Sequence, residues 1–195
     1  MTWMIDKSHT EVTFAVRHLM VSTIRGQFTR FDASVTLDPE HTDGSSVNAT
    51  VDAASLETGN PERDTHLRSS DFLDVVEYPT ITFVSSQVAQ VGQDSVWVRG
   101  ELSIHGVTRE VTLRGRFDGP VADLIGERVV GFELTAEVDR RDFGLTWDLP
   151  LTGGGVFVGN AVTIAINTEL RESESGEAPS PATLARLQGL PYYGR

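Results

Sequence analysis

The chain of 195 residues contains no cysteine. Disulfide bonds, thiolate zinc sites, iron–sulfur clusters and cysteine nucleophiles are therefore excluded. Positive charge is also scarce, because 16 Lys and Arg face 28 Asp and Glu and the formal net charge is −12. A chain this acidic repels phosphate backbones and anionic lipid surfaces. We therefore expect no general nucleic-acid binding and no electrostatic docking to a membrane.

Long apolar runs are missing as well. No stretch approaches the roughly 18 consecutive apolar residues that a membrane-spanning helix needs, although 39% of the residues are hydrophobic. The opening segment, MTWMIDKSHTEV, has neither the basic region nor the apolar run of a signal peptide. These features predict a cytoplasmic protein with no integral membrane segment, and the length suits a single domain.

The sequence does contain a strong alternation of apolar and polar residues. Val12, Phe14 and Val16 alternate with Thr13 and Ala15. An alternation of period two is typical of antiparallel strands with one buried face. Eight segments show it, at 12–17, 31–37, 47–53, 80–88, 95–104, 107–117, 129–139 and 157–170.

The shortest connection between two of these segments is His105-Gly106. It predicts a two-residue hairpin turn. Such a turn places Val98 opposite Leu113 on the apolar face, so the register that it imposes agrees with the hydrophobic pattern. A turn this short also excludes a helical crossover at this point.

Eight strands with mostly short connections predict an all-β fold, an eight-stranded antiparallel up-and-down barrel. A barrel of eight strands either fills with side chains or encloses one small ligand. Small residues on the inner face, among them Ala33, Ala49 and Gly100, favour an open lumen. The inner apolar side chains expected to contact a ligand there are Phe14, Val16, Phe31, Val51, Phe83, Val98, Leu102, Leu113, Phe132, Leu134 and Ile164.

Two connectors are long, 58–79 and 140–156. Each strand of such a barrel reverses the direction of the last, so both connectors cross the end at which the short hairpin turn lies. We call this end the mouth. Within the first connector Pro61 is a typical helix start, and RDTHLRSSDF (63–72) predicts a short helical lid over the mouth.

The same segment, RDTHLRSSDF, has two alternative interpretations. Asp64, His66 and a serine contain the groups of a catalytic triad, and Asp64, His66 and Asp71 contain those of a metal site. These residues lie within one short segment instead of converging from separate elements. Their spacing also matches no zinc or calcium pattern. We therefore expect neither a catalytic residue nor a metal ligand here.

Cationic or titratable side chains gather at the mouth. At that end, the inward-facing apolar rows of three predicted strands continue into His18, Arg109 and Arg140. The lid contributes Arg63 and His66. Apolar rows that end in such groups predict a site for an amphiphile. Its apolar tail would occupy the lumen, and its polar or anionic head group would contact these five residues.

Each rim cation has an alternative partner in a loop carboxylate, such as Asp64 or Asp142, because charge is seldom buried unpaired. On that interpretation these side chains would stabilise the fold and would not bind a ligand.

Four segments resemble the YceI-like family. They are 3–28, 55–83, 100–113 (GELSIHGVTREVTL) and 140–145 (RRDFGL), in collinear order. The resemblance covers about residues 3–170. It implies a lipocalin-like eight-stranded antiparallel barrel whose lumen binds polyisoprenoid-type or other amphiphilic lipids, and it is compatible with a homodimer.

The residues and the resemblance together predict a YceI-like lipid-binding domain at 1–170. The tail at 171–195 is rich in Ser, Glu and Pro, which is typical of disorder. We expect the barrel to bind a polyprenyl phosphate or an isoprenoid quinone for transport, storage or sequestration, with no catalysis and no cofactor. Two alternatives remain open. One is an enzyme that acts on a lipid with His18 or His66 as the base, and the other is a filled barrel that binds a protein partner.

Overall fold

The computed structural model describes residues 2–173, apart from 39–40, 42–43, 124–125, 150 and 152–153. Of the tail predicted at 171–195, only the first residues fall in this range, and they continue the last strand to Ser173. The remainder of that tail lies outside the described residues. Within the described range, no helix has the length and apolar character needed to cross a membrane.

Strands make up most of the fold. In chain order they are β1 (Thr2–His18), β2 (Ser22–Phe28), β3 (Phe31–Thr36), β4 (Ser46–Asp52), β5 (Leu56–Glu57), β6 (Thr80–Val91), β7 (Ser95–Ile104), β8 (Val107–Ala122), β9 (Arg128–Asp139) and β10 (Val158–Ser173). Helical elements in the described part of the chain include α1 (Pro61–Arg68) and the short 3-10 helices η2 (Ala53–Ser55) and η3 (Arg140–Phe143).

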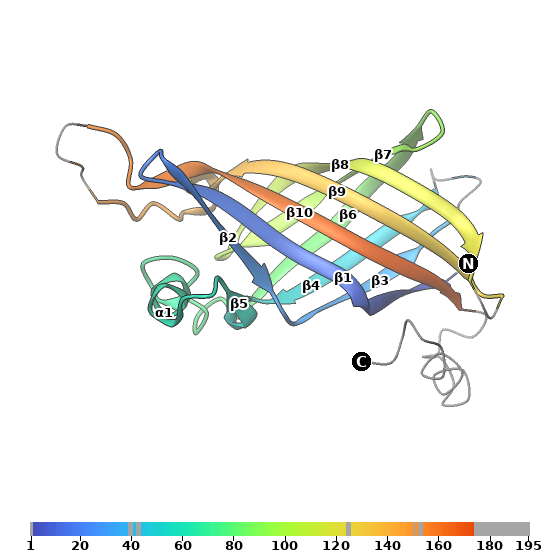
Figure 1. Ribbon diagram of the computed structural model, residues 1–195, viewed down its shortest axis with the longest axis horizontal. Coiled ribbons are helices and arrows are strands. Elements are labelled where there is room, and N and C mark those ends of the chain that lie inside the picture. The colour runs from blue at the N-terminus through green and yellow to red at the C-terminus, as the bar shows by residue number, and fades with distance from the viewer. Residues whose placement is uncertain are drawn as a thin grey trace.

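The strands form one closed antiparallel barrel (Figure 1). Its wall follows the order β10-β9-β8-β7-β6-β4-β3-β1, and β1 returns to pair with β10. In that closing pair Phe14 lies opposite Ile164, so the inner row of the first strand meets the inner row of the last. The eight-stranded antiparallel barrel predicted from the sequence is confirmed.

Two of the barrel strands are each broken into two pieces. β2 pairs with the C-terminal part of β1 and β3 with its N-terminal end, so both are parts of one strand interrupted at Thr29 and Arg30. β4 and β5 are separated by η2 in the same way. The sequence analysis missed β2 because Gly26 interrupts the apolar alternation on the inner row. A Cβ at Gly26 would lie 2.4 Å from Phe14 Cζ, so the glycine makes room for that ring.

The β7–β8 hairpin has the predicted register. Val98 lies opposite Leu113, and the two strands are joined by His105 and Gly106 alone. Both turn residues have positive φ angles, 52° and 72°, which match the twist of the flanking strands.

The short helix α1 lies at one end of the barrel, the mouth (Figure 1). Its start is fixed locally. The Asn60 side chain accepts a hydrogen bond from the backbone N–H of Arg63, and Pro61 stands in the first turn, where its missing N–H is not needed. Leu67 on the helix and Phe72 after it line the space inside the barrel. The predicted lid helix is therefore present, and its apolar side chains contribute to the lumen.

Candidate functional site

The interior of the barrel holds a cavity of about 310 Å³, within the size range of small-ligand sites. Ala33 and Ala49 pair across β3 and β4 on its wall, and their small side chains help to leave this space open. Most of the lining is apolar. All the residues predicted to contact a ligand in the lumen line the cavity, namely Phe14, Val16, Phe31, Val51, Phe83, Val98, Leu102, Leu113, Phe132, Leu134 and Ile164.

The barrel end opposite the mouth is closed by buried side chains. Trp3 is 1% exposed, and its indole Nε1 donates a hydrogen bond to the carbonyl oxygen of Leu37 at 3.0 Å. Val130 and Leu170 pair across β9 and β10 in the same core. An apolar chain in the lumen would therefore meet a packed apolar floor at this end.

Arg140 begins η3 at the mouth and is 5% exposed. Its Nε donates to the carbonyl of Gly159 and its Nη2 to that of Val158, each at 3.1 Å. Its Nη1 donates to the carbonyls of Leu145 at 2.6 Å and Trp147 at 2.8 Å. Burial lowers the pKa of the guanidinium, but arginine remains charged near neutral pH. Arg140 lines the cavity, yet these four hydrogen bonds hold the connector between η3 and β10 against the barrel.

Arg63 is bound by the segment that leads into α1. Its Nε donates to the Thr58 hydroxyl at 2.7 Å, and its Nη2 donates to the Thr58 carbonyl at 2.9 Å. The buried Asp64 carboxylate accepts a hydrogen bond from the backbone N–H of the same threonine at 3.0 Å. Arg63 and Asp64 thus fix the approach to the helix through one shared residue.

His66 belongs to a group of aromatic side chains at the mouth. Its Nε2 lies 2.8 Å from a carboxylate oxygen of Asp71. The edges of its ring meet Phe72 and Trp147, with ring centroids 5.1 and 4.7 Å apart. Because Arg140 binds the carbonyl of Trp147, one tryptophan joins α1 to the connector after η3. These contacts join the lid helix to the connector at the mouth.

His18 and Arg109 lie near strand ends at the mouth. The His18 ring makes an edge contact with Phe157, with centroids 4.7 Å apart. The Arg109 side chain is exposed and donates to the carbonyl of Thr108 at 2.9 Å. Of the five residues predicted to bind a head group, all of them described, only Arg140 lines the cavity. The structure therefore does not gather these five around one opening of the lumen.

A second site, which the sequence analysis missed, lies on the outside of the barrel wall. It is a cleft between β1 and the junction of β2 with β3. Thr10, Val12, Phe28 and Phe31 line both this cleft and the lumen. The sequence signal for the cleft is the polar run DKSHT at 6–10, which interrupts the alternation along the first strand.

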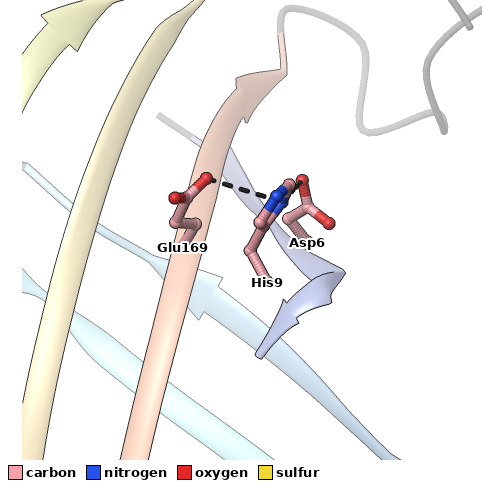
Figure 2. Close-up of side chains that lie close together, drawn as sticks. All are labelled: Asp6, His9 and Glu169. Carbon is pink, nitrogen blue, oxygen red and sulfur yellow. Dashed lines mark hydrogen bonds and ion pairs between the residues drawn. The ribbon is translucent and has the colours of Figure 1, made fainter. Parts of the chain in front are cut away.

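Figure 2 shows a cluster where β1 meets β10 near the closed end. His9 Nδ1 lies 3.0 Å from Asp6 Oδ2 and 3.7 Å from a Glu169 carboxylate oxygen. One imidazole and two carboxylates within 4.8 Å are groups that can ligate a metal ion. However, Arg171 Nε donates to the same Asp6 oxygen at 3.1 Å and already supplies a positive charge.

Burial alone would raise the pKa of the Asp6 carboxyl. The hydrogen bonds from Ser8, His9 and Arg171 outweigh burial and hold the pKa well below its usual range. The arrangement is an ion-pair network that joins the first strand to the last.

Comparison with known proteins places this architecture in a family. Residues 3–170 match the YceI-like domain. The chain belongs to the YceI-like family. The match spans the whole barrel, from β1 into β10, so the YceI-like domain and the cavity coincide.

Several relatives of this YceI-like barrel show the extent of the similarity. A UPF0312 protein of Vibrio cholerae is 38% identical over 138 residues, which cover 71% of this chain and 73% of the relative. A UPF0312 protein of an Enterobacter strain is 40% identical over 147 residues, 74% of this chain and 76% of the relative.

Solved structures agree with the fold. Burkholderia cenocepacia BcnA superposes with a TM-score of 0.73 and 25% identity, covering 85% of this chain and 98% of that one. A polyisoprenoid binding domain from Saccharophagus degradans superposes with a TM-score of 0.67 and 14% identity, covering 88% of this chain and 98% of that one. At that identity the second similarity establishes the shared fold.

Proposed function

We propose that this YceI-like barrel binds the tail of an amphiphilic isoprenoid-type lipid in its lumen. A polyprenyl phosphate or an isoprenoid quinone fits the proposal, and the role is transport, storage or sequestration without catalysis. The observation that supports it is the apolar cavity inside the closed barrel. A neighbour with the same fold, from Saccharophagus degradans, is a polyisoprenoid binding domain.

The hydrophobic effect supplies enough free energy for such binding. Burial of one CH₂ group contributes about 0.8 kcal/mol, so one five-carbon isoprene unit contributes roughly 4 kcal/mol before the cost of ordering is subtracted. An apolar lining stabilises any apolar tail in this way, because it forms no hydrogen bonds that would distinguish one tail from another. Specificity would then depend on tail length and on the head group.

The two alternative functions have less support. A barrel filled by its own side chains would not contain the cavity. An enzyme that used His18 or His66 as a base would need that imidazole at the lumen. Both side chains instead contact aromatic rings at the mouth, and neither lines the cavity.

The proposal keeps two earlier expectations, a cytoplasmic location from the sequence features and a homodimer from the family resemblance. Cell fractionation tests the first, and recovery of the protein outside the cytoplasm would contradict it. Sedimentation velocity tests the second, and a particle of the monomer mass, 21.3 kDa, would contradict it.

Native mass spectrometry of freshly purified protein, followed by organic extraction, tests lipid binding directly. Ala49→Phe should fill part of the lumen and reduce the bound lipid, because Ala49 faces the cavity. Thr50→Phe is the matched control, since the next residue of β4 is exposed on the outer face. A mass without lipid, together with no uptake of added geranylgeranyl phosphate or geranylgeranyl benzoquinone, would contradict the proposal.

A further inference from the structure

We propose that the polar head group of the ligand lies in the side cleft between β1 and the β2–β3 junction. We also propose that the ligand enters and leaves through this cleft and not through the mouth. This inference rests on the proposed lipid binding and adds to it the site of the head group and the route of exchange.

The first argument is a gap in the hydrogen-bonded wall. β1 pairs with β3 only from Thr2 to Met4, and with β2 only from Val12 to His18. Residues 5–11 and 29–33 are fully described, and no ladder pair joins these two segments. A barrel wall is held shut by such pairs, so this is a place where it can open without breaking any of them.

Both sides of the gap have a local cause. On one side β1 bulges, because the register with β10 shifts between Asp6 and Glu11. On the other side the backbone turns toward η2. The N–H of Thr29 bonds to the Ser55 carbonyl at 3.2 Å, and that of Arg30 bonds to the Ser55 hydroxyl at 3.1 Å. The polar backbone groups at the break are thus satisfied away from β1, which keeps the gap stable.

The second argument is that the cleft and the lumen share side chains. Val12, Phe28 and Phe31 line both spaces, and Thr10 lies at the boundary between them. Movement of two aromatic rings would therefore connect the cavity with solvent. Ring rotations of this kind need no change in the strand pairing.

The third argument is the distribution of polar groups. The exposed polar residues that line the cleft are Lys7, Glu11, Gln27, Thr29 and Arg30. The Arg30 guanidinium also binds the Asp52 carboxylate, with its Nε donating at 2.9 Å. Lys7 lies 3.4 Å from Asp32 across the gap. Lys7, Gln27 and Thr29 can donate hydrogen bonds, so they fit a head group with acceptor oxygens, which a phosphate ester and a quinone share. At the mouth, the Arg140 guanidinium donates to four backbone carbonyls.

A reversible cross-link tests the route of exchange. Glu11 precedes Val12 and Thr29 follows Phe28, so they are the first residues beyond the last β1–β2 pair, and both line the cleft. The chain has no cysteine of its own. The Glu11→Cys/Thr29→Cys protein is loaded with geranylgeranyl phosphate or geranylgeranyl benzoquinone while reduced, then oxidised and mixed with acceptor vesicles. We expect release to slow about tenfold or more and to recover when the disulfide is reduced.

A matched cross-link controls for stiffening of the wall. Ser103 and Thr108 pair across the β7–β8 hairpin with their hydroxyls 2.6 Å apart, so Ser103→Cys/Thr108→Cys closes no gap. If the disulfide at the cleft does not form, Gln27→Trp covers the cleft and Arg25→Trp, on the same outer face, does not. Equal release rates from the closed-cleft protein and its control would overturn the route for that probe.

The position of the head group has a separate readout. Lys7 is the only lysine in the sequence, so an acetylating reagent modifies one side-chain amine. In an Arg114→Lys protein the added lysine, on the exposed face of β8, serves as an internal reference. Either probe should slow acetylation of Lys7 several-fold relative to the reference. Equal acetylation with bound probe would overturn the head-group site, whereas no uptake of either probe would overturn the lipid-binding function itself.

Discussion

The Arg140 guanidinium donates hydrogen bonds to four backbone carbonyl oxygens, which belong to residues up to 19 positions further along the chain. We predict that Arg140→Met lowers the free energy of unfolding by about 2–4 kcal/mol, because the carbonyls lose their donors while they remain partly buried. Urea denaturation measures the change. Arg141→Met is the control, since the Arg141 guanidinium is exposed, binds only Asp139 among the contacts described, and should matter much less. Equal losses in the two variants would contradict the role of Arg140.

Leu19 and Met20 form the turn between β1 and β2 with φ angles of 51° and 61°. Large side chains disfavour this left-handed region, where Asn and Gly are common. We therefore predict that Leu19→Asn/Met20→Gly raises the stability by about 1 kcal/mol, measured as an upward shift of the unfolding temperature. Val21→Ser is the control, because Val21 does not have a positive φ. A double variant less stable than the parent would contradict the prediction.

The β7–β8 hairpin depends on the backbone freedom of one glycine. Gly106 has a φ of 72°, and a Cβ there would lie 2.6 Å from a ring carbon of Tyr78. We predict that Gly106→Ala destabilises the protein by about 1–3 kcal/mol, through strain and through displacement of that ring. Gly131→Ala is the matched control in a strand, since no atom lies within 4 Å of its added Cβ. Chemical denaturation should separate the two, and similar stabilities would contradict the argument.

The sequence predicts the strands well wherever side-chain alternation and turn chemistry agree. The segment from 95 to 117 has both, so its strands and register follow from local rules. The same reasoning does not predict β2, because Gly26 interrupts the alternation, and the glycine is explained by the Phe14 ring and the Thr58 methyl group that a Cβ would meet. A partner ring from another strand is tertiary information.

The candidate site also contains some features that the sequence predicts and others that it does not. Alternation identifies which residues face inward, so the lumen residues follow from the sequence. It does not identify the partner of an inward cation. Arg140 is correctly placed on an inward row, but its partners are backbone carbonyls. Every residue has a backbone carbonyl, so the sequence does not identify which ones Arg140 binds. The side cleft arises from two strand breaks that meet in space, and each break alone resembles an ordinary irregularity.

The whole barrel closes where β1 meets β10, and the Asp6–Arg171 ion pair lies on that junction. Because the pKa of Asp6 is lower in the folded protein than in the unfolded chain, its contribution is full at neutral pH. It is lost as the pH falls below about 4, the ordinary aspartate value. We predict that Asp6→Asn costs about 1–3 kcal/mol at pH 7.

The difference between the parent and Asp6→Asn should shrink steadily below pH 4. Thermal unfolding of both proteins from pH 7 to pH 2.5 measures it. A difference that stayed constant over this range would show that the carboxylate charge is not what stabilises the junction.

The pairing of β1 with β10 has a consequence for synthesis of the chain on the ribosome. About 140 residues separate the end of β1 from the start of β10. At about 5–20 residues per second the first strand therefore waits roughly 7–28 seconds for its final partner. During that interval the growing sheet has an unpaired edge and an uncovered apolar face, which is the state most exposed to aggregation. Chaperone demand should therefore peak just before the last strand emerges.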